Sequence, residues 1–326
     1  MKVLVLGATG FIGGHIAKQA LSEGWTVRAL RRNPQATGHI SDLPIEWVSG
    51  TLTDISAITE AMHGIDIVFH AAAFYPKKGS SRNIDTQTAY ASREISTLLS
   101  AAKNAQVKRF IYTSTLTTIG RPPKNETRLA DERDFYIPGS LPKSIYYEAK
   151  FHMEKQVLEA ALQGLPATVL NPTAVFGPGD VHLTLGGLLI AIARGYGLAY
   201  LPGSINVVDV RDVASAHIQA AKYGQIGERY ILGGHNLSIK QAMSFASDVA
   251  QVSSPKFKVP LPLIDLIVLF SDMLPILPLP TNHLRALRHW QAYNTEKAES
   301  HLNLSPRPFE HTVRDALHWF RSQGML

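Results

Sequence analysis

The chain has 326 residues, enough for one large domain or for a domain with a smaller companion. Its composition, 45% hydrophobic and 18% charged, is that of a globular protein with a substantial core. It contains no cysteine, which excludes a disulfide framework, a thiolate metal site and a cysteine nucleophile, and we predict no metal site. The formal net charge of +6 comes from scattered basic residues, which suit an anionic small molecule better than a nucleic acid. No signal peptide precedes the first strand, so we expect a cytoplasmic protein.

The N-terminal segment predicts a strand, a tight turn and a helix. The apolar run 3–6 leads directly into Gly7-Ala8-Thr9-Gly10-Phe11-Ile12-Gly13 and an amphipathic stretch. The N–H groups at the start of such a helix favour an anion, and the glycines let the backbone approach a pyrophosphate closely. The spacing G-x-x-G-x-x-G differs from the commoner G-x-G-x-x-G, and a plain glycine turn is the alternative. The predicted dinucleotide contacts here are Gly7, Thr9, Gly10, Phe11, Ile12 and Gly13.

Strand and helix patterns then alternate through the first half. Short β-branched-rich runs at 25–30, 45–48, 65–71, 109–113 and 167–171 enclose helical patterns at 55–62, 90–104 and 145–162. Alternation predicts an α/β fold, a Rossmann-type doubly wound parallel sheet whose ligand lies beyond the carboxyl ends of the strands. A strand at 206–210, a helix at 212–221 and a strand at 229–232 follow, and later helices are separated by proline-rich turns. We predict a dinucleotide-binding domain over 1–172 with 206–234, and a smaller, mostly helical, discontinuous substrate domain over 173–205 and 235–326.

Residues 259–280 raise the question of membrane contact. Asp265 and Asp272 enclose their longest charge-free core, and several prolines flank or break it. A spanning helix needs about 20 predominantly apolar residues, so no transmembrane segment is predicted. A lid or substrate-wall helix is the first interpretation, and peripheral membrane contact is the second.

Tyr146 and Lys150 stand four residues apart at the head of the helical pattern 145–162, so their side chains share one face. A phenol has an ordinary pKa of about 10, too high for efficient proton transfer near neutrality. A lysine ammonium about 4 Å away contributes roughly 4 kcal/mol at an effective dielectric near 20. That energy would lower the phenol pKa by about three before desolvation opposes it. The pair can therefore make an acid that works near pH 7, although the spacing alone also suits an ordinary surface pair.

Several motifs in order resemble the extended short-chain dehydrogenase/reductase family, also called the NAD-dependent epimerase/dehydratase family, over nearly the whole chain. Within it the chain is most similar to the dihydroflavonol-4-reductase-like branch, which includes the hopanoid-associated sugar epimerase group; the segment 227–234 carries the latter likeness. The motifs are Gly7-x-x-Gly10-x-x-Gly13, His70-Ala71-Ala72-Ala73, Tyr112-Thr113-Ser114-Thr115, Tyr146-x-x-x-Lys150, Asn171-Pro172 with Gly177-Pro178-Gly179-Asp180, and Asp209-Val210-Arg211-Asp212-Val213-Ala214.

The resemblance implies a role for each catalytic residue. Tyr146 would be the general acid, and Lys150 would lower its pKa and hold the nicotinamide ribose. Thr115, placed by its distance from Gly120, would polarise the carbonyl, with Ser114 as the alternative one residue earlier. Further cofactor contacts are implied at Ala71, Ala72, Ala73, Thr113, Asn171 and Pro172. Family members commonly pair through the long helices of the Rossmann domain, so a homodimer is also implied.

The end of the second strand indicates which cofactor is bound. An acid there would accept hydrogen bonds from the ribose 2′-hydroxyl of NAD, but this chain has Arg31 and Arg32 and no acid. Two guanidiniums suit a doubly charged 2′-phosphate, so NADP is predicted over NAD; two solvated surface arginines are the alternative.

Two departures from the family pattern stand near the expected site. The usual Gly-Asp-Leu after the third strand is Gly50-Thr51-Leu52, so Thr51 and Leu52 would contact adenine without a carboxylate. The usual Asn-Val-x-Gly-Thr of the fourth helix is replaced by residues 91–95, Ala-Ser-Arg-Glu-Ile, which places the packing of that helix in question.

These observations predict an NADP-dependent oxidoreductase that reduces a ketone or aldehyde in a mid-sized, partly apolar small molecule. Its pocket would be formed by Phe74, Tyr75, the loop 176–182 and the apolar segment 261–279. One alternative is a nucleotide-sugar epimerase using NAD(P), and another is a non-catalytic NADP-binding sensor or assembly protein. A dehydratase is disfavoured because Leu116, not an acid, follows Thr115.

Overall fold

The computed structural model describes residues 1–72, 84–141, 144–260, 262–263 and 291–326. Its centre is a seven-stranded sheet in the order β10-β6-β5-β4-β1-β2-β3, in which every neighbouring pair is parallel. The central strands are short, apolar and almost fully buried, as strands covered on both faces must be. Their bounds are β1 (Lys2–Leu6), β2 (Thr26–Arg31), β3 (Glu46–Ser49), β4 (Ile67–His70), β5 (Arg109–Thr113), β6 (Ala167–Pro172) and β10 (Arg229–Leu232).

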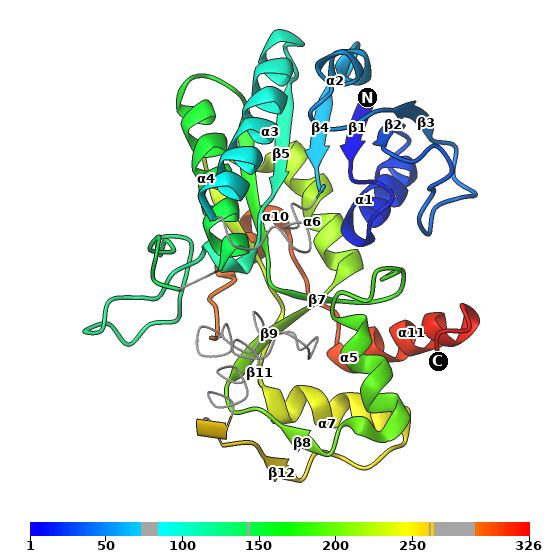
Figure 1. The fold of residues 1–326 in the computed structure, drawn as a ribbon, viewed down its shortest axis with the longest axis vertical. Coiled ribbons are helices and arrows are strands. Elements are labelled where there is room, and N and C mark those ends of the chain that lie inside the picture. Colours follow the sequence, from blue (N-terminus) through cyan, green and yellow to red (C-terminus); the bar gives the residue numbers. More distant parts are fainter. Residues whose placement is uncertain (73–83, 142–143, 261, 264–290) are drawn as a thin grey trace.

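Helices cover both faces of this sheet, each with its own apolar core (Figure 1). One face carries α1 (Phe11–Ser22), α6 (Val210–Tyr223) and α10 (Glu296–Leu302). The other carries α2 (Ile55–Met62), α3 (Ile84–Asn104) and α4 (Ile145–Leu162). This arrangement confirms the predicted Rossmann-type fold class.

A smaller C-terminal region lies below the large sheet in Figure 1. It has a three-stranded sheet, β11-β9-β7, and a two-stranded sheet, β12-β8, which pack with three α-helices around a third apolar core. The strands are β7 (Ala174–Phe176), β8 (Ala199–Tyr200), β9 (Ser204–Asp209), β11 (His235–Ser238) and β12 (Phe257–Lys258). The helices are α5 (Gly186–Ala191), continued by a π-helical turn η2 (Ile192–Tyr196), α7 (Ile239–Ala250) and α11 (Phe309–Ser322).

Two elements differ from the sequence-based expectation. The strand expected at 206–210 is β9, and it joins the small sheet, whereas the following α6 and β10 pack on or join the large sheet. The helix expected from residue 90 already begins at Ile84, because the first turns of α3 are polar and carry no apolar periodicity. The altered motif in this helix does not interrupt it, since Ala91 and Ile95 are both fully buried in the core.

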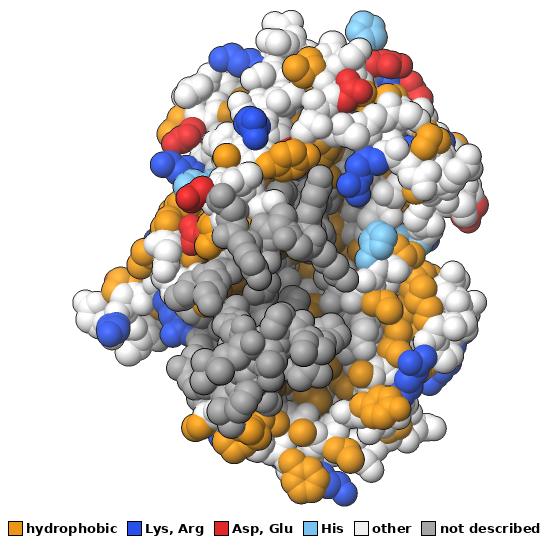
Figure 2. Space-filling view, in the orientation of Figure 1, with side chains coloured by type: hydrophobic (Ala, Val, Ile, Leu, Met, Phe, Trp, Pro, Cys, Tyr) orange, Lys and Arg blue, Asp and Glu red, His pale blue; other side chains and the backbone are white. Residues whose placement is uncertain are grey.

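Figure 2 shows Lys and Arg side chains dispersed among acidic and apolar ones over the described part of one face. Within the residues that the structure describes, no helix combines the length and the apolar character needed to cross a membrane. Phe74, Tyr75 and nearly all of the segment 261–279, which were expected to line the pocket, lie outside the described residues.

Candidate active site

The candidate site lies along the carboxyl ends of β1, β4, β5 and β6. The chain reverses its direction of travel across the sheet at β1: β2 pairs with one edge of β1, and β4 pairs with the other edge. In doubly wound sheets a ligand binds in the crevice outside such a switch point. The glycine turn after β1 and the segment after β4 meet at this edge.

The glycine turn is built for close approach of backbone to backbone. Gly7 has φ +92°, and the Gly10 N–H donates to the Gly7 carbonyl at 2.9 Å. A Cβ at Gly7 would lie 2.6 Å from the Ala72 nitrogen, and one at Gly13 would lie 2.1 Å from the Gly7 oxygen. Gly10 is the N-cap of α1 and offers no side chain to the N–H groups of its first turn. The turn therefore fits a pyrophosphate, whose oxygens would accept from those groups.

The residues predicted to contact the dinucleotide at this turn lie close to one another. Thr9, Phe11 and Ile12 follow Gly7 around the head of α1, and the backbone of Ala71 and Ala72 packs against Gly7. Ala73 lies outside the described residues.

The two arginines at the end of β2, Arg31 and Arg32, have different surroundings. Arg31 ends β2, and its guanidinium carbon lies 4.8 Å from the centre of the Trp47 ring on β3. Its Nη1 donates to the Ala36 carbonyl at 3.4 Å, while its Nε is buried without a partner among the described residues. Arg32 is exposed, and its charge acts on Glu94 of α3. Trp47 was not predicted as part of the site, because the sequence gives no register between β2 and β3.

The segment after β3 carries the two residues predicted to contact adenine. Thr51 is exposed, and its hydroxyl lies 3.1 Å from that of Thr53. Leu52 packs against the core formed with α2 and α3. The residue before them, Gly50, donates its N–H to the Arg31 carbonyl, which ties this segment to the end of β2.

Lys150 is a charged residue of the site that is almost fully buried. It projects from α4 with only 2% of its surface exposed, and its Nζ lies 3.4 Å from the Thr113 carbonyl and 5.4 Å from the centre of the Tyr112 ring. Burial lowers the pKa of Lys150 to about 8, partly offset by the negative charges of Glu154 and Glu94. Tyr146, one turn earlier on the same helix, is half-buried against a cluster of aromatic side chains.

Two buried groups lie beneath this lysine. His70, the last residue of β4, is fully buried and meets the Tyr112 ring edge-on at a centroid distance of 5.4 Å. Burial, reinforced by the charge of Lys150, lowers the pKa of His70 to about 3, so the imidazole is neutral. Burial likewise raises the pKa of Tyr112. The floor of the site is therefore uncharged at neutral pH and keeps the local dielectric low.

Thr115 and Ser114 follow β5 and have different surroundings. Thr115 is half-buried and is the N-cap of a single 3-10 turn, η1 (Leu116–Thr118); its Oγ1 accepts from the Thr117 N–H at 3.4 Å. Ser114 is buried, and its hydroxyl donates to Glu154 of α4. Of the two hydroxyls considered for the third catalytic position, that of Ser114 is thus already engaged in the interior.

Thr113 and Asn171 also face inward. The His217 Nδ1 lies 2.7 Å from the Val213 carbonyl, which can only accept, so the Nε2 accepts from the Thr113 hydroxyl at 2.8 Å. Asn171 is fully buried, and its amide nitrogen lies 2.8 Å from a carboxylate oxygen of Glu154. Pro172, the last residue of β6, is also buried.

The loop 176–182, expected in the pocket wall, joins the small region to α1. The Pro178 carbonyl lies 2.8 Å from the His15 Nε2, one turn beyond the glycine turn. Asp180 is buried and accepts from the N–H groups of Thr184 and Gly186, which fixes the loop before α5. His182 is exposed.

A doubly wound parallel sheet, a glycine turn at its switch point and a tyrosine–lysine pair on the adjoining helix define a dinucleotide-binding α/β protein. Residues 3–233 match the model of the NAD dependent epimerase/dehydratase family. The chain belongs to this family, whose members use an NAD(P) nucleotide.

Named relatives and solved structures align over almost the entire chain. It is 32% identical to a protein named "Putative dihydroflavonol 4-reductase" from Synechocystis sp., covering 99% of this chain and 95% of that protein. It is 29% identical to "Sterol demethylase protein B" of Methylococcus capsulatus, with full coverage of both. The crystal structure of PA4631, a nucleoside-diphosphate-sugar epimerase from Pseudomonas aeruginosa, is 25% identical with a TM-score of 0.84, covering 100% of this chain and 99% of that one.

Proposed function

We propose that this protein is an NADP-dependent oxidoreductase that reduces a ketone or aldehyde to the alcohol. When bound, the reduced nicotinamide supplies the hydride to the carbonyl carbon. Tyr146 then donates its phenolic proton to the carbonyl oxygen, so that C=O becomes CH–OH and the phenolate is reprotonated from solvent. Thr115 donates a hydrogen bond to the same oxygen as its negative charge develops.

The observation that carries the proposal is the burial of Lys150 one turn after Tyr146. A lysine held at 2% exposure costs free energy, and its ammonium donates to the Thr113 carbonyl at the carboxyl edge of the sheet. A positive charge in this low-dielectric place favours the phenolate of a neighbouring tyrosine, which makes the phenol a stronger acid. An ordinary surface pair would have an exposed lysine.

The preference for NADP rests on Arg31 and Arg32. No acid follows β2 to bind a ribose 2′-hydroxyl, and the Arg31 guanidinium carbon lies over the Trp47 ring, which restricts the orientation of this side chain. A guanidinium is well suited to charged hydrogen bonds with a phosphate. The exposed Arg32 adds a second positive charge.

The likeness to PA4631, a nucleoside-diphosphate-sugar epimerase, supports a second candidate, a sugar epimerase. Epimerization uses the same hydride chemistry in both directions and returns the cofactor to its starting state. A third candidate is an NADP-binding sensor without turnover. The two arginines at the end of β2, Arg31 and Arg32, favour the reductase over the epimerase. Retention of both Tyr146 and Lys150 favours the reductase over the sensor.

The test is oxidation of NADPH with a panel of ketones and aldehydes, compared with NADH. We expect turnover with NADPH and a loss of about 10²-fold or more in Tyr146→Phe. Tyr147→Phe is the matched control, because this neighbouring phenol is buried against Tyr136, and burial raises its pKa. Wild-type turnover in Tyr146→Phe would contradict the assignment. Interconversion of nucleotide sugars without net NADPH loss would identify an epimerase, and NADPH binding without any turnover would identify a sensor.

A further inference from the structure

A second charged group, Glu154, lies buried one turn beyond Lys150 on α4. Its side chain is 3% exposed and that of its partner Arg229, the first residue of β10, is 4% exposed. The Glu154 Oε1 and Arg229 Nε lie 2.7 Å apart as an ion pair, although their alignment is not that of a hydrogen bond. Breaking a buried pair by removing one partner is strongly destabilising. The pair therefore fixes α4 against the first residue of β10.

The other carboxylate oxygen of Glu154 collects donors from two neighbouring segments. Its Oε2 accepts from the Ser114 hydroxyl, from the Thr118 hydroxyl at 2.6 Å and from the Asn171 amide at 2.8 Å. Ser114 and Thr118 stand immediately on either side of the segment 115–117. Both ends of the turn that carries Thr115 are therefore attached to one carboxylate.

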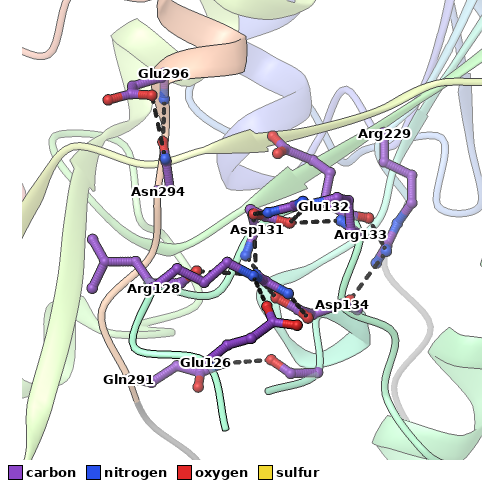
Figure 3. A network of polar contacts seen from close by, with 12 residues as sticks. Glu126, Arg128, Asp131, Glu132, Arg133, Asp134, Arg229, Gln291, Asn294 and Glu296 are labelled. Atoms are coloured by element: carbon purple, nitrogen blue, oxygen red, sulfur yellow. Dashed lines mark hydrogen bonds and ion pairs between the residues drawn. The ribbon is translucent and has the colours of Figure 1, made fainter. Parts of the chain in front are cut away.

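The Arg229 side chain contacts the backbone of the same turn. Its Nη2 donates to the Thr118 carbonyl at 2.9 Å, and its Nη1 donates to the Glu132 carbonyl at 2.9 Å. Figure 3 shows Arg229 beside the segment 126–134, in which Arg128 pairs with Asp134 at 2.6 Å. On the other side of the turn, the Gly120 N–H donates to the Asp134 carbonyl at 3.0 Å.

We propose that Glu154 is a positioning residue that, paired with Arg229, holds the Ser114–Thr118 turn so that the Thr115 hydroxyl faces the reacting carbonyl. This inference rests on the proposed function, because it assigns Thr115 to the carbonyl oxygen. Glu154 does not touch the substrate in this assignment. Its carboxylate accepts hydrogen bonds from the Ser114 and Thr118 hydroxyls, which would otherwise compete with the Thr115 hydroxyl.

The same carboxylate acts on Lys150 through space. The negative charge of Glu154 favours the charged lysine, which burial disfavours. Glu154→Gln keeps the shape of the side chain but removes that charge, so Lys150 loses its proton at a lower pH. The other titratable groups that act on Lys150 or lie against it are unchanged by this substitution: Glu94 of α3, His70 of β4 and Tyr112 of β5. Tyr146 of α4, which acts on Tyr112, is unchanged as well.

The test measures turnover of NADPH against pH for Glu154→Gln, Thr118→Val and the control Glu148→Gln. We expect Glu154→Gln to lower kcat by about 10- to 100-fold, to change the KM for NADPH by less than about threefold, and to move the alkaline limb of the profile to lower pH. Thr118→Val removes one donor but keeps the charge, so kcat should fall without movement of that limb. Glu148 also lies on α4, but it accepts from the Tyr136 hydroxyl and the Gly139 N–H, so its substitution should leave both quantities near wild type.

Hydrogen exchange of the segment 114–120 separates this inference from the proposed function. We expect faster exchange there in Glu154→Gln and Thr118→Val, and wild-type exchange in Glu148→Gln. Unchanged exchange, a wild-type kcat, or a lower kcat without movement of the alkaline limb in Glu154→Gln would overturn the role of Glu154. If Glu154→Gln does not fold, Thr118→Val decides through kcat and exchange. A wild-type protein that binds NADPH but reduces no carbonyl would instead overturn the proposed function.

Discussion

Replacement of Lys150 by methionine should stabilise the cofactor-free protein while abolishing its activity. Methionine is similar in length to the lysine stem and carries no charge, so it can occupy the same space among Tyr112 and the surrounding core. The lysine is almost fully buried, and the negative charges of Glu154 and Glu94 offset part of the cost of its own charge. Removing the charge removes that cost.

The size of the effect follows from the pKa of Lys150. A fall from 10.5 to about 8 corresponds to roughly 3 kcal/mol at 1.36 kcal/mol per pKa unit. Between these values the unfolded chain binds the proton and the folded protein does not, so the stability of the wild type rises with pH. The advantage of Lys150→Met should therefore be full below about pH 8 and disappear toward pH 10.5.

Urea unfolding of the cofactor-free protein at several pH values measures this difference. Lys155→Met is the matched control on the same helix, because Lys155 is exposed and pairs with Glu159 at 3.7 Å. That substitution should change the free energy of unfolding by less than about 1 kcal/mol. The reasoning is refuted if Lys150→Met gains no stability at pH 7, or if its gain is the same at pH 7 and pH 10.

Two further predictions concern the cofactor and acid stability. Arg32→Ala should weaken NADPH binding by about tenfold or more and leave NADH binding nearly unchanged, since only NADPH carries the 2′-phosphate. Fluorescence titration at fixed salt measures both affinities, and Arg133→Ala, at an exposed arginine, is the control. Equal weakening of NADPH and NADH binding would argue against the assignment of Arg32 to the 2′-phosphate. Burial lowers the pKa of His217 to about 4 and that of His70 to about 3, so both are neutral in the folded protein and take up protons on unfolding. Their contribution to stability should be complete above about pH 6.5 and be lost as the pH falls toward 4, at about 1.4 kcal/mol per pH unit for each. Chemical unfolding between pH 7 and 5 checks this, and a flat stability over that range would contradict it.

The alternation of strands and helices along the chain could be predicted because the apolar runs are short, nearly continuous and separated by helical periodicity. The glycine turn could also be predicted from the sequence, because its geometry requires glycine: Gly7 has a positive φ and Gly13 has no room for a Cβ. The sheet to which β9 belongs could not be predicted. Its partners β7 and β11 follow β6 and β10 within a few residues, and nothing in their side chains says that the chain changes sheets there.

The candidate site was predictable only where its residues are close in the sequence or match a family motif. Tyr146 and Lys150 share a helix, and Thr115 follows a recognisable strand. Glu154 stands four residues after Lys150, a spacing that places it on the same face of α4, but its partner Arg229 lies far along the chain, on β10. Which charges meet in the interior depends on the packing of α4 against β5, β6 and β10, which the sequence does not state.

The altered motif in α3 acquires a chemical meaning from this packing. Ala91 fills the core where the family has asparagine, while Glu94 stands where the family has glycine and places a half-buried acid near the site. Burial raises the pKa of Glu94, while the charges of Lys150 and Arg32 oppose that rise. Glu94 in turn favours the charged form of Lys150. The residue that departs from the expected pattern thus favours the charged form of Lys150, on which the acidity of Tyr146 depends in the proposed mechanism, and it does so from α3 rather than from α4.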